Sequence, residues 1–456
     1  MAAILPLNRA GARASARLFG FGTPLLLCAI AGLTTAAAPA QSAPPTPAIS
    51  HAAEMPELAG PGAMAIGTET LTLARGHRII DVTMWYPSAP EARSPEARGP
   101  GAVYRHTFAR PGSAAVELAE PGRAVFQAAP AGSGHFPLVL ISHGYGGWGT
   151  HMSRLGEALA SHGYVVASID HRDRAFTDGA SFVVSFSEVL GNRAGDQRAV
   201  LHALLGDAAG SSPLIAPRLA ALIDKNAVGV IGYSMGGYGA LTVAGAAVDP
   251  QAPAFAPVPA AARGALAEAD PALSAKIKAV VAIAPWGAQP GSAVWTDAGL
   301  ARVTAPLLLI DGDQDDVADF SNGVSRVFAA AKGAERYLLV FREAAHNVAG
   351  NPIALPADAG FGAIENASDP VWRKDRIEGI DEHFIRAFFD HNLKHDAGAA
   401  RYLNVPVPQS DAGTWPSAFG QQWGGTYAGD AQPAYWRGFQ RRWAAGLELH
   451  HKRAGE

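Results

Sequence analysis

The stretch VGVIGYSMGG, residues 228–237, decides the fold of this chain. Its first four residues are mostly apolar and predict a short buried strand, while residues 237–246 have the spacing of a helix. Between the two lies GYSMG (232–236), the Gly-x-Ser-x-Gly pattern in which a strained turn from strand to helix presents a serine. Alone, the pattern also occurs in glycine-rich turns without chemistry. The strand and helix around it predict that Ser234 is a nucleophile.

Short apolar runs alternate with helical segments on both sides of this turn. The runs, each predicted to be a buried strand, are residues 137–141, 164–169, 277–283, 306–310 and 337–341. The predicted helices are residues 152–161, 193–205, 213–223 and 324–331. This alternation predicts an α/β fold with a mostly parallel, doubly wound sheet and helices on both of its faces. Residues 68–86 alternate around Arg75-Gly76 and predict N-terminal antiparallel strands.

The segments around this core are less regular. Residues 41–60 are rich in Pro, Ala and Ser and are predicted to be a linker, followed by a catalytic domain at 61–350. Within that domain, residues 88–136 and 249–276 are expected to be irregular insertions, although 116–126 have the character of a strand. The insertion at 249–276 and the C-terminal extension are expected to be able to shape the pocket, and neither identifies the acyl chain.

The C-terminal extension, residues 351–456, is expected to pack on the catalytic domain. It contains one clear helical stretch, residues 377–393. That helix is expected to lie at the surface, with His383, His391 and His395 in contact with solvent. The sequence of the extension assigns it no role in chemistry.

The N-terminus has the three parts of a secretory signal peptide. Three arginines within the first 17 residues precede an apolar stretch, 18–36, and small residues that end at Ala40. This arrangement predicts cleavage after Ala40 and a secreted or periplasmic protein, with no integral membrane span after cleavage. The alternative is an uncleaved membrane anchor, because the apolar stretch is close to the length that spans a bilayer. The single cysteine, Cys28, lies inside the predicted signal, so the mature chain has no thiol nucleophile.

Charge and composition limit the class of partner. The formal net charge is −4, and the chain has no run rich in Lys or Arg. Nucleic acid is therefore not expected as a partner. Hydrophobic residues make up 48% of the chain, enough to build a large core, so an intrinsically disordered protein is excluded.

A serine hydroxyl needs a base, and the base needs an acid to orient it. In folds with this serine turn the three follow in the order serine, acid, histidine. His346 lies just after the strand at 337–341 and is the predicted base. The acid is expected in the loop after residues 306–310, where Asp315 is preferred and Asp313 and Asp316 are the alternatives.

The acidic loop also permits a different interpretation, a calcium site. Asp311, Asp313 and Asp315 alternate as ligands do in an EF-hand. However, Asp316 stands where that loop needs glycine, and Asn322 stands where it needs glutamate. No metal ligand is therefore assigned, and no cofactor is expected.

Two backbone N–H groups are expected to form an oxyanion hole for the ester carbonyl. One belongs to Met235, which directly follows the nucleophile, and the other is assigned to Tyr145 in the loop ISHGYGG (141–147). His143 in this loop is interpreted as a structural support, the alternative being a second base. Tyr145 would also place an aromatic ring beside the acyl group.

Two further aromatic residues are candidates for contact with the substrate. Tyr233 precedes the nucleophile, and Trp286 follows the strand at 277–283 at the same expected edge of the sheet. Since a tryptophan at this place also suits a buried core, both interpretations of Trp286 stay open. With Tyr145, these residues complete the expected substrate-binding set.

The chain resembles the platelet-activating-factor acetylhydrolase and dienelactone-hydrolase-like branch of the α/β-hydrolases. The resemblance is carried by FPLVLISHG (136–144), LASHGYVV (159–166) and DHRDR (170–174), and it covers about residues 60 to 350. It implies the α/β-hydrolase fold and ester hydrolysis. Dienelactone hydrolases use a cysteine nucleophile, which the mature chain lacks.

Other departures bear on the substrate. The acetylhydrolases usually have histidine where this chain has Tyr233, and their eukaryotic members carry the acid where this chain reads APW (284–286). The order APW, Asp315, His346 is more similar to bacterial cutinases and polyester hydrolases. Phospholipid specificity is therefore in doubt, while ester hydrolysis is compatible with each departure.

These observations predict an exported serine carboxylic ester hydrolase that forms an acyl-enzyme. The expected substrate is a small-molecule or lipid ester with a short- to medium-chain acyl group. The alternatives are a phospholipid acetylhydrolase and a hydrolase of cutin or other polyesters. A hypothesis from another class is an exported binding protein that has the fold without activity.

Overall fold

One mixed sheet organises the chain. The computed structural model describes residues 54–89, 101–109, 114–132, 134–206, 217–415 and 434–456, so the predicted signal peptide lies outside the described residues. Within them the sheet has 11 strands in the order β11-β10-β9-β8-β7-β5-β6-β2-β1-β4-β3. The described residues belong to a single compact unit.

The centre of this sheet is parallel, as predicted. Its strands are β6 (Val165–Asp170), β5 (Phe136–Ser142), β7 (Ile223–Tyr233), β8 (Ile277–Ile283), β9 (Leu307–Gly312) and β10 (Arg336–Phe341). Each contains an apolar run that the sequence marks as a buried strand. Parallel neighbours end at one common edge, so the loops that follow β5, β7, β9 and β10 open on the same side of the sheet.

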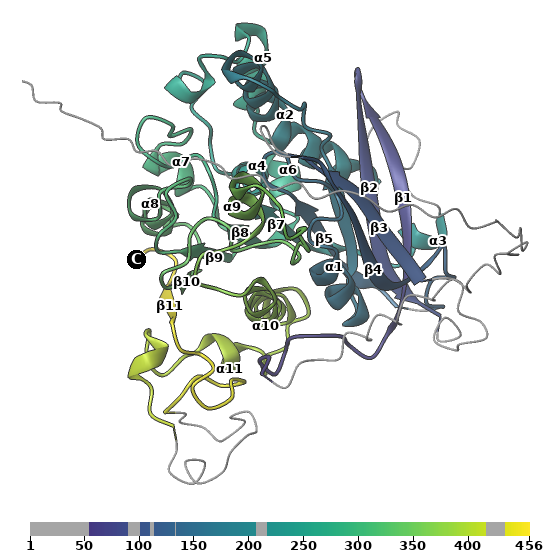
Figure 1. The fold of residues 1–456 in the computed structure, drawn as a ribbon, viewed down its shortest axis with the longest axis vertical. Coiled ribbons are helices and arrows are strands. Elements are labelled where there is room, and N and C mark those ends of the chain that lie inside the picture. The colour runs from purple at the N-terminus through teal and green to yellow at the C-terminus, as the bar shows by residue number, and fades with distance from the viewer. Residues whose placement is uncertain (1–53, 90–100, 110–113, 133, 207–216, 416–433) are drawn as a thin grey trace, which may run out of the picture. The chain divides into compact units, whose positions relative to one another are not determined.

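Helices cover both faces of these strands (Figure 1). Side chains of a strand alternate between faces, so Leu138 and Leu140 of β5 pack in the cluster that includes α2 (Gly179–Leu205) and α4 (Met235–Val243). Val139 and Ile141 pack in the cluster that includes α1 (Ser153–Ser161) and α10 (Lys374–Leu393). The architecture is that of the α/β-hydrolase fold, as predicted.

Antiparallel strands extend the sheet beyond β6. Strands β1 (Ala65–Arg75) and β2 (Arg78–Ser88) form the predicted hairpin, with Arg75 opposite Arg78. Next to them lie β4 (Val116–Phe126), also expected, and β3 (Gly101–Phe108). The expectation of an irregular insertion is therefore wrong for β3, whereas the strand expected at 116–126 is present as β4. The alternating exposure of β3 was hidden in the sequence by the Gly- and Pro-rich segments on both sides of it.

The C-terminal extension contributes to the same sheet and core. Strand β11 (Leu447–Lys452) pairs antiparallel with β10, which the sequence did not predict. Helix α10 covers a face of β7 and β8, so the expectation that it lies at the surface is wrong. Its His383 is fully buried, whereas His395 is exposed as expected. The predicted domain limit at residue 350 therefore does not coincide with a boundary of the sheet.

Shorter elements complete the fold. They are α3 (Pro217–Ala220), η2 (Pro253–Phe255), α5 (Ala260–Leu266), α6 (Pro271–Ser274), α7 (Asp297–Leu300), η3 (Phe320–Val324), α8 (Ser325–Ala330), α9 (Phe361–Ala367), α11 (Ala400–Leu403) and η4 (Ser410–Ala412). The insertion at 249–276 thus contains short helical segments. The helix predicted at 213–223 is confirmed only as α3. Residues 213–216 of that prediction lie outside the described residues, and Ile223 already begins β7. Helix α2 begins at Gly179, well before the predicted residue 193.

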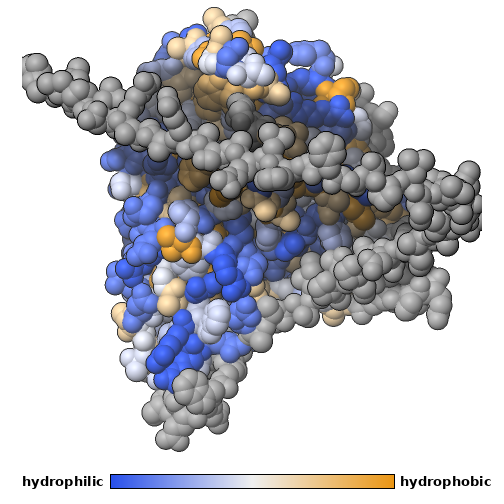
Figure 2. Space-filling view, viewed as in Figure 1, coloured by the Kyte–Doolittle hydropathy of each residue, from blue (hydrophilic) through white to orange (hydrophobic). Residues whose placement is uncertain are grey.

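The surface is consistent with the burial of most apolar residues between the sheet and the helices on its two faces. On the face drawn in Figure 2, hydrophilic residues predominate and hydrophobic residues form small separate patches. Of the helices in the described part of the chain, none has the length and apolar character that a membrane span requires.

Candidate active site

Ser234 lies on a strained turn between β7 and α4. Its backbone has φ 52° and ψ −114°, a conformation that L-residues rarely adopt. A Cβ on Gly232 would lie 2.2 Å from the carbonyl oxygen of Gly236, and a Cβ on Gly236 would lie 2.0 Å from that of Ser142. Both positions therefore require glycine. The pattern GYSMG exists because the chain must pass this close to itself in order to present the serine.

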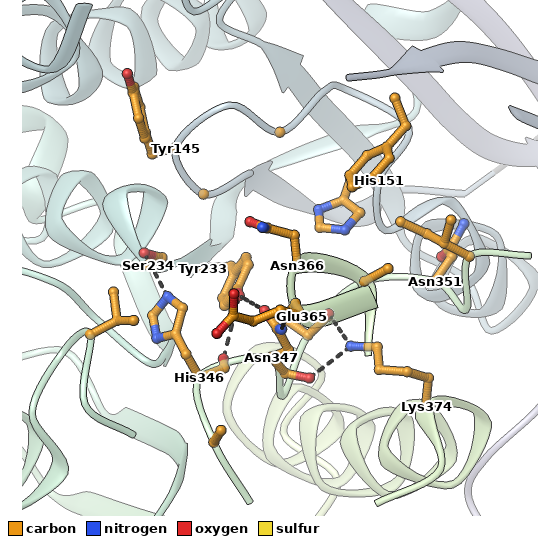
Figure 3. Close-up of a pocket in the computed structure, with 18 of the residues that line it drawn as sticks. Tyr145, His151, Tyr233, Ser234, His346, Asn347, Asn351, Glu365, Asn366 and Lys374 are labelled. Carbon is orange, nitrogen blue, oxygen red and sulfur yellow. Dashed lines mark hydrogen bonds between the residues drawn. The ribbon is translucent and has the colours of Figure 1, made fainter. Parts of the chain in front are cut away.

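The structure brings the three predicted residues of the triad together. The Nε2 atom of His346 lies 3.0 Å from Oγ of Ser234, and its Nδ1 lies 2.7 Å from Oδ2 of Asp315. Figure 3 shows His346 beside Ser234 at one side of a pocket. The spacing suits a neutral imidazole that donates Nδ1–H to the carboxylate and accepts the serine proton on Nε2.

Asp315 is held as a carboxylate by its surroundings. Burial works against its charge, but the hydrogen bond from His346 and the N–H of Ala318 keep the pKa of Asp315 below its ordinary value. The two alternative acids have other surroundings. Asp313 accepts the backbone N–H of Glu343, and Asp316 lines the pocket.

Within the acidic loop, the carboxyl of Asp311 interacts with that of Asp315. Asp311 is fully buried and accepts the N–H of Gly312. Its pKa is raised well above the ordinary value, by burial first and then by the charge of Asp315. Among the described residues, no group of three or more His, Cys, Asp or Glu side chains is arranged to hold a metal ion.

The two predicted oxyanion donors belong to different elements near Ser234. Met235 is the first residue of α4, where N–H groups have no partner within a helix. Tyr145 lies in the loop after β5 and lines the same pocket as Ser234. Its ring turns into an aromatic group with Phe176, Phe182 and Phe186, and its hydroxyl donates to Ser185.

A cavity of about 380 Å³ opens beside the triad. Its lining comes from the loop after β5, from the loops that carry the acid and the base, and from α9 and α10; it includes Phe108, Tyr145, Trp148, His151, Tyr233, Ser234, His346, Asn347, Asn351, Glu365, Asn366 and Lys374. Two of the three expected substrate-binding residues, Tyr145 and Tyr233, are thus at the pocket. Trp286 is not among its lining residues, is buried, and packs edge-on against Phe186, as a core tryptophan does.

The sequence suggested that the C-terminal extension could shape the pocket, but it identified none of the residues that do so. The loop that carries His346 is held by residues far along the chain. Lys374 donates to the carbonyl oxygens of Asn347, at 2.8 Å, and Ala349, at 2.5 Å. Asp369 accepts the N–H of Ala345 at 2.8 Å. No pattern in the sequence signals these contacts, because each is made by a single side chain to the backbone of a distant loop.

Comparison with known proteins confirms the resemblance predicted from the sequence. A family model described as platelet-activating factor acetylhydrolase, isoform II, matches residues 113–200. Cutinase est1 of Thermobifida alba is 26% identical over 239 residues, which are 51% of this chain and 62% of the relative. Platelet-activating factor acetylhydrolase of Bos taurus is 38% identical over 58 residues, 13% of each chain.

The extent of these matches is limited. The chain spans 62% of the length of the cutinase and 13% of that of the acetylhydrolase. The match to the family model includes the loop after β5 and the DHRDR segment, but it ends before Ser234.

Proposed function

We propose that this protein is an exported serine carboxylic ester hydrolase. The observation that carries the proposal is the hydrogen-bonded series Ser234, His346, Asp315 beside a cavity, with the serine on a strained turn. A serine in such a position is activated by its histidine, and a fold of this kind supplies the acid and the base in this order.

The proposed reaction has two halves. The Oγ of Ser234 attacks the ester carbonyl while Nε2 of His346 takes its proton, and Asp315 stabilises the resulting imidazolium. The N–H groups of Met235 and Tyr145 donate hydrogen bonds to the developing oxyanion. His346 then protonates the departing alcohol, leaving an acyl-serine. Water, deprotonated by the same histidine, attacks this ester and releases the acid and free Ser234.

The comparisons support an ester as the bond that is cleaved, since the relatives are named cutinases and acetylhydrolases. A cavity of about 380 Å³ lies at the lower end of the range for small-ligand sites. This size favours short- to medium-chain acyl esters. A polyester or cutin-type substrate is the second candidate, favoured by the longer match to the cutinase.

The test is hydrolysis of p-nitrophenyl esters from two to twelve carbons by the protein without its predicted signal, in the presence and absence of EDTA. Short esters should be cleaved, Ser234→Ala should lose at least about 10³-fold in kcat, and EDTA should have no effect. A fluorophosphonate probe should label the wild type and not the variant. A folded wild type that neither hydrolyses esters nor takes the label would favour the inactive binding protein instead.

Export is part of the proposal and has its own test. When the full chain is expressed, the protein should be recovered outside the cytoplasm of the producing cell with Gln41 as its new N-terminal residue. Retention of residues 1–40 in a membrane fraction would favour the uncleaved anchor.

A further inference from the structure

The loop that carries the proposed oxyanion donor Tyr145 rests on a second, buried layer. The N–H of Gly146 donates to Oδ2 of Asp173 at 2.9 Å, and the guanidinium of Arg193 donates to the same oxygen at 2.7 Å. The side chains of Arg193 and Asp173 are 1% and 4% exposed. A charge-assisted contact this well shielded from water fixes geometry more firmly than a surface pair does.

Two histidines fix the start of the same loop. The backbone N–H of His171 donates to Nε2 of His143, at 3.1 Å. The Nδ1 of His143 therefore carries the proton and donates to the carbonyl oxygen of Gly144, at 2.6 Å. Burial lowers the pKa of His143, which keeps the ring neutral and the direction of both bonds fixed. This is the structural role that the sequence suggested for His143.

His171 also belongs to a second Ser-His-Asp series. Nε2 of His171 is 2.8 Å from Oγ of Ser142, and Nδ1 is 3.1 Å from Oδ2 of Asp196. All three side chains are at most 1% exposed, so no substrate reaches them. The series anchors the end of β5 to α2 and is no second catalytic site.

Helix α2 supports both halves of the oxyanion hole from one face. Positions 193, 196 and 197 lie on the same side of a helix. Arg193 holds Asp173, Asp196 holds His171, and Gln197 donates to the carbonyl oxygen of Gly236 at 3.0 Å. Gly236 follows Met235, so one helix contacts the loop that bears one proposed donor and the turn that bears the other.

We infer that Asp173, held by Arg193, is a positioning residue for the oxyanion hole. Its bond to Gly146 fixes the peptide plane between Tyr145 and Gly146, and so restricts the orientation of the neighbouring Tyr145 N–H. This inference rests on the proposed function. Asp173 touches no substrate, and its effect is expected only where charge develops on the carbonyl oxygen.

The kinetic test is Asp173→Asn, which keeps the shape and removes the charge. A donor displaced by a fraction of an ångström should lower kcat by about 10- to 100-fold while KM stays within about twofold. Binding of a boronic acid, which forms a tetrahedral adduct on the serine, should weaken by a similar factor. Arg193→Lys keeps the positive charge, and it should show the same kcat-only signature with a smaller loss, which covers the case that Asp173→Asn folds poorly.

The matched control is Asp390→Asn. Asp390 is similarly buried and accepts hydrogen bonds from Arg386, Lys394 and Tyr164, but it lies on α10 away from the oxyanion loop. This change should lower the melting temperature and leave kcat unaltered. Equal kcat losses in the control and in Asp173→Asn would reduce Asp173 to a general contributor to stability and overturn the inference.

Hydrogen exchange separates this inference from the proposed function. Peptides covering residues 142–149 should exchange faster in Asp173→Asn than in the wild type, and at the wild-type rate in Asp390→Asn. If the wild type hydrolyses no ester but this difference is present, the positioning role holds and the esterase proposal fails. If the wild type is active and neither kcat nor the exchange of this loop changes, the positioning role is refuted alone.

Discussion

Asp311 shows how a buried carboxyl beside the triad affects stability. Its pKa is raised well above the ordinary value by burial and by the charge of Asp315. A carboxyl with a higher pKa in the folded than in the unfolded state binds its proton more tightly when folded. Its contribution to stability is therefore complete below the unfolded pKa and is lost as the pH rises towards the folded pKa.

Asp311→Asn should remove this dependence, because the amide is close in shape to the protonated acid and does not titrate. The melting temperature of the variant relative to the wild type should rise between pH 4 and pH 8. Thermal unfolding at several pH values measures it. A difference that is constant with pH would mean that Asp311 does not take up a proton on folding.

Gly236 tests the close approach at the serine turn. Gly236→Ala should lose most activity and be destabilised by about 2 kcal/mol or more, because its Cβ would lie 2.0 Å from the backbone oxygen of Ser142. The control is Gly264→Ala in α5, where a Cβ meets nothing within 4 Å. Alanine there should stabilise the helix slightly. Chemical denaturation and ester hydrolysis of both variants measure these effects. Equal losses in the two variants would mean that the close contact between Gly236 and Ser142 is not the cause.

Among single residues, the sequence predicted those that directly follow a strand. It missed those that contact the backbone of a loop far away in the sequence. Ser234, Asp315 and His346 each come shortly after an apolar run, and parallel strands bring their ends to one edge. Asp173 and Lys374 gain their roles only through contacts with backbone groups of other loops. Such contacts depend on tertiary packing and leave no periodicity in the chain.

Among the elements, α10 connects the C-terminal segment to the loop of His346, the proposed base. Lys374 at its start holds the loop of His346 through two carbonyl oxygens. Lys374→Met keeps the aliphatic stem and removes the donors, so kcat should fall about tenfold with little change in KM. Steady-state kinetics on a short ester measures this.

The control for this change is Lys394→Met on the same helix. Lys394 donates to Asp390 and to the carbonyl oxygen of His162, and it does not contact the loop of His346. Its kcat should remain at the wild-type value. If Lys374→Met retains full activity while folded, the clamp on the loop contributes nothing to catalysis.

The elements also show where periodicity is informative. The parallel strands were predictable because continuous apolar runs are typical of strands buried on both faces. Helix α10 was predictable as a helix, but its burial was not, since its polar residues include a fully buried histidine, His383. Strand β11 carries charged and histidine side chains at the sheet edge, so its sequence, LELHHK, gave no apolar run.

For the molecule as a whole, β11 closes one edge of the sheet. Deleting residues 447–456 would expose the whole length of β10 and remove the carbonyl oxygens of Arg453 and Glu456, which accept from the fully buried Arg336. The truncated protein should melt at least 5 °C lower and aggregate more readily, because an unpaired strand edge recruits other chains. Thermal unfolding and light scattering measure these effects. An unchanged melting temperature would show that the extension is dispensable for the fold.

The position of β11 in the sequence also affects the order in which the parts of the site are synthesised. A ribosome synthesises Ser234 and both proposed oxyanion loops before it reaches Lys374, which holds the loop of His346, and β11, which pairs with β10. A nascent chain halted between them would carry Ser234, Asp315 and His346 without the contacts of Lys374 or strand β11. Completion of the proposed site therefore has to wait for the synthesis of residues 374–452, and a chain halted before them would lack the contacts that hold the loop of His346.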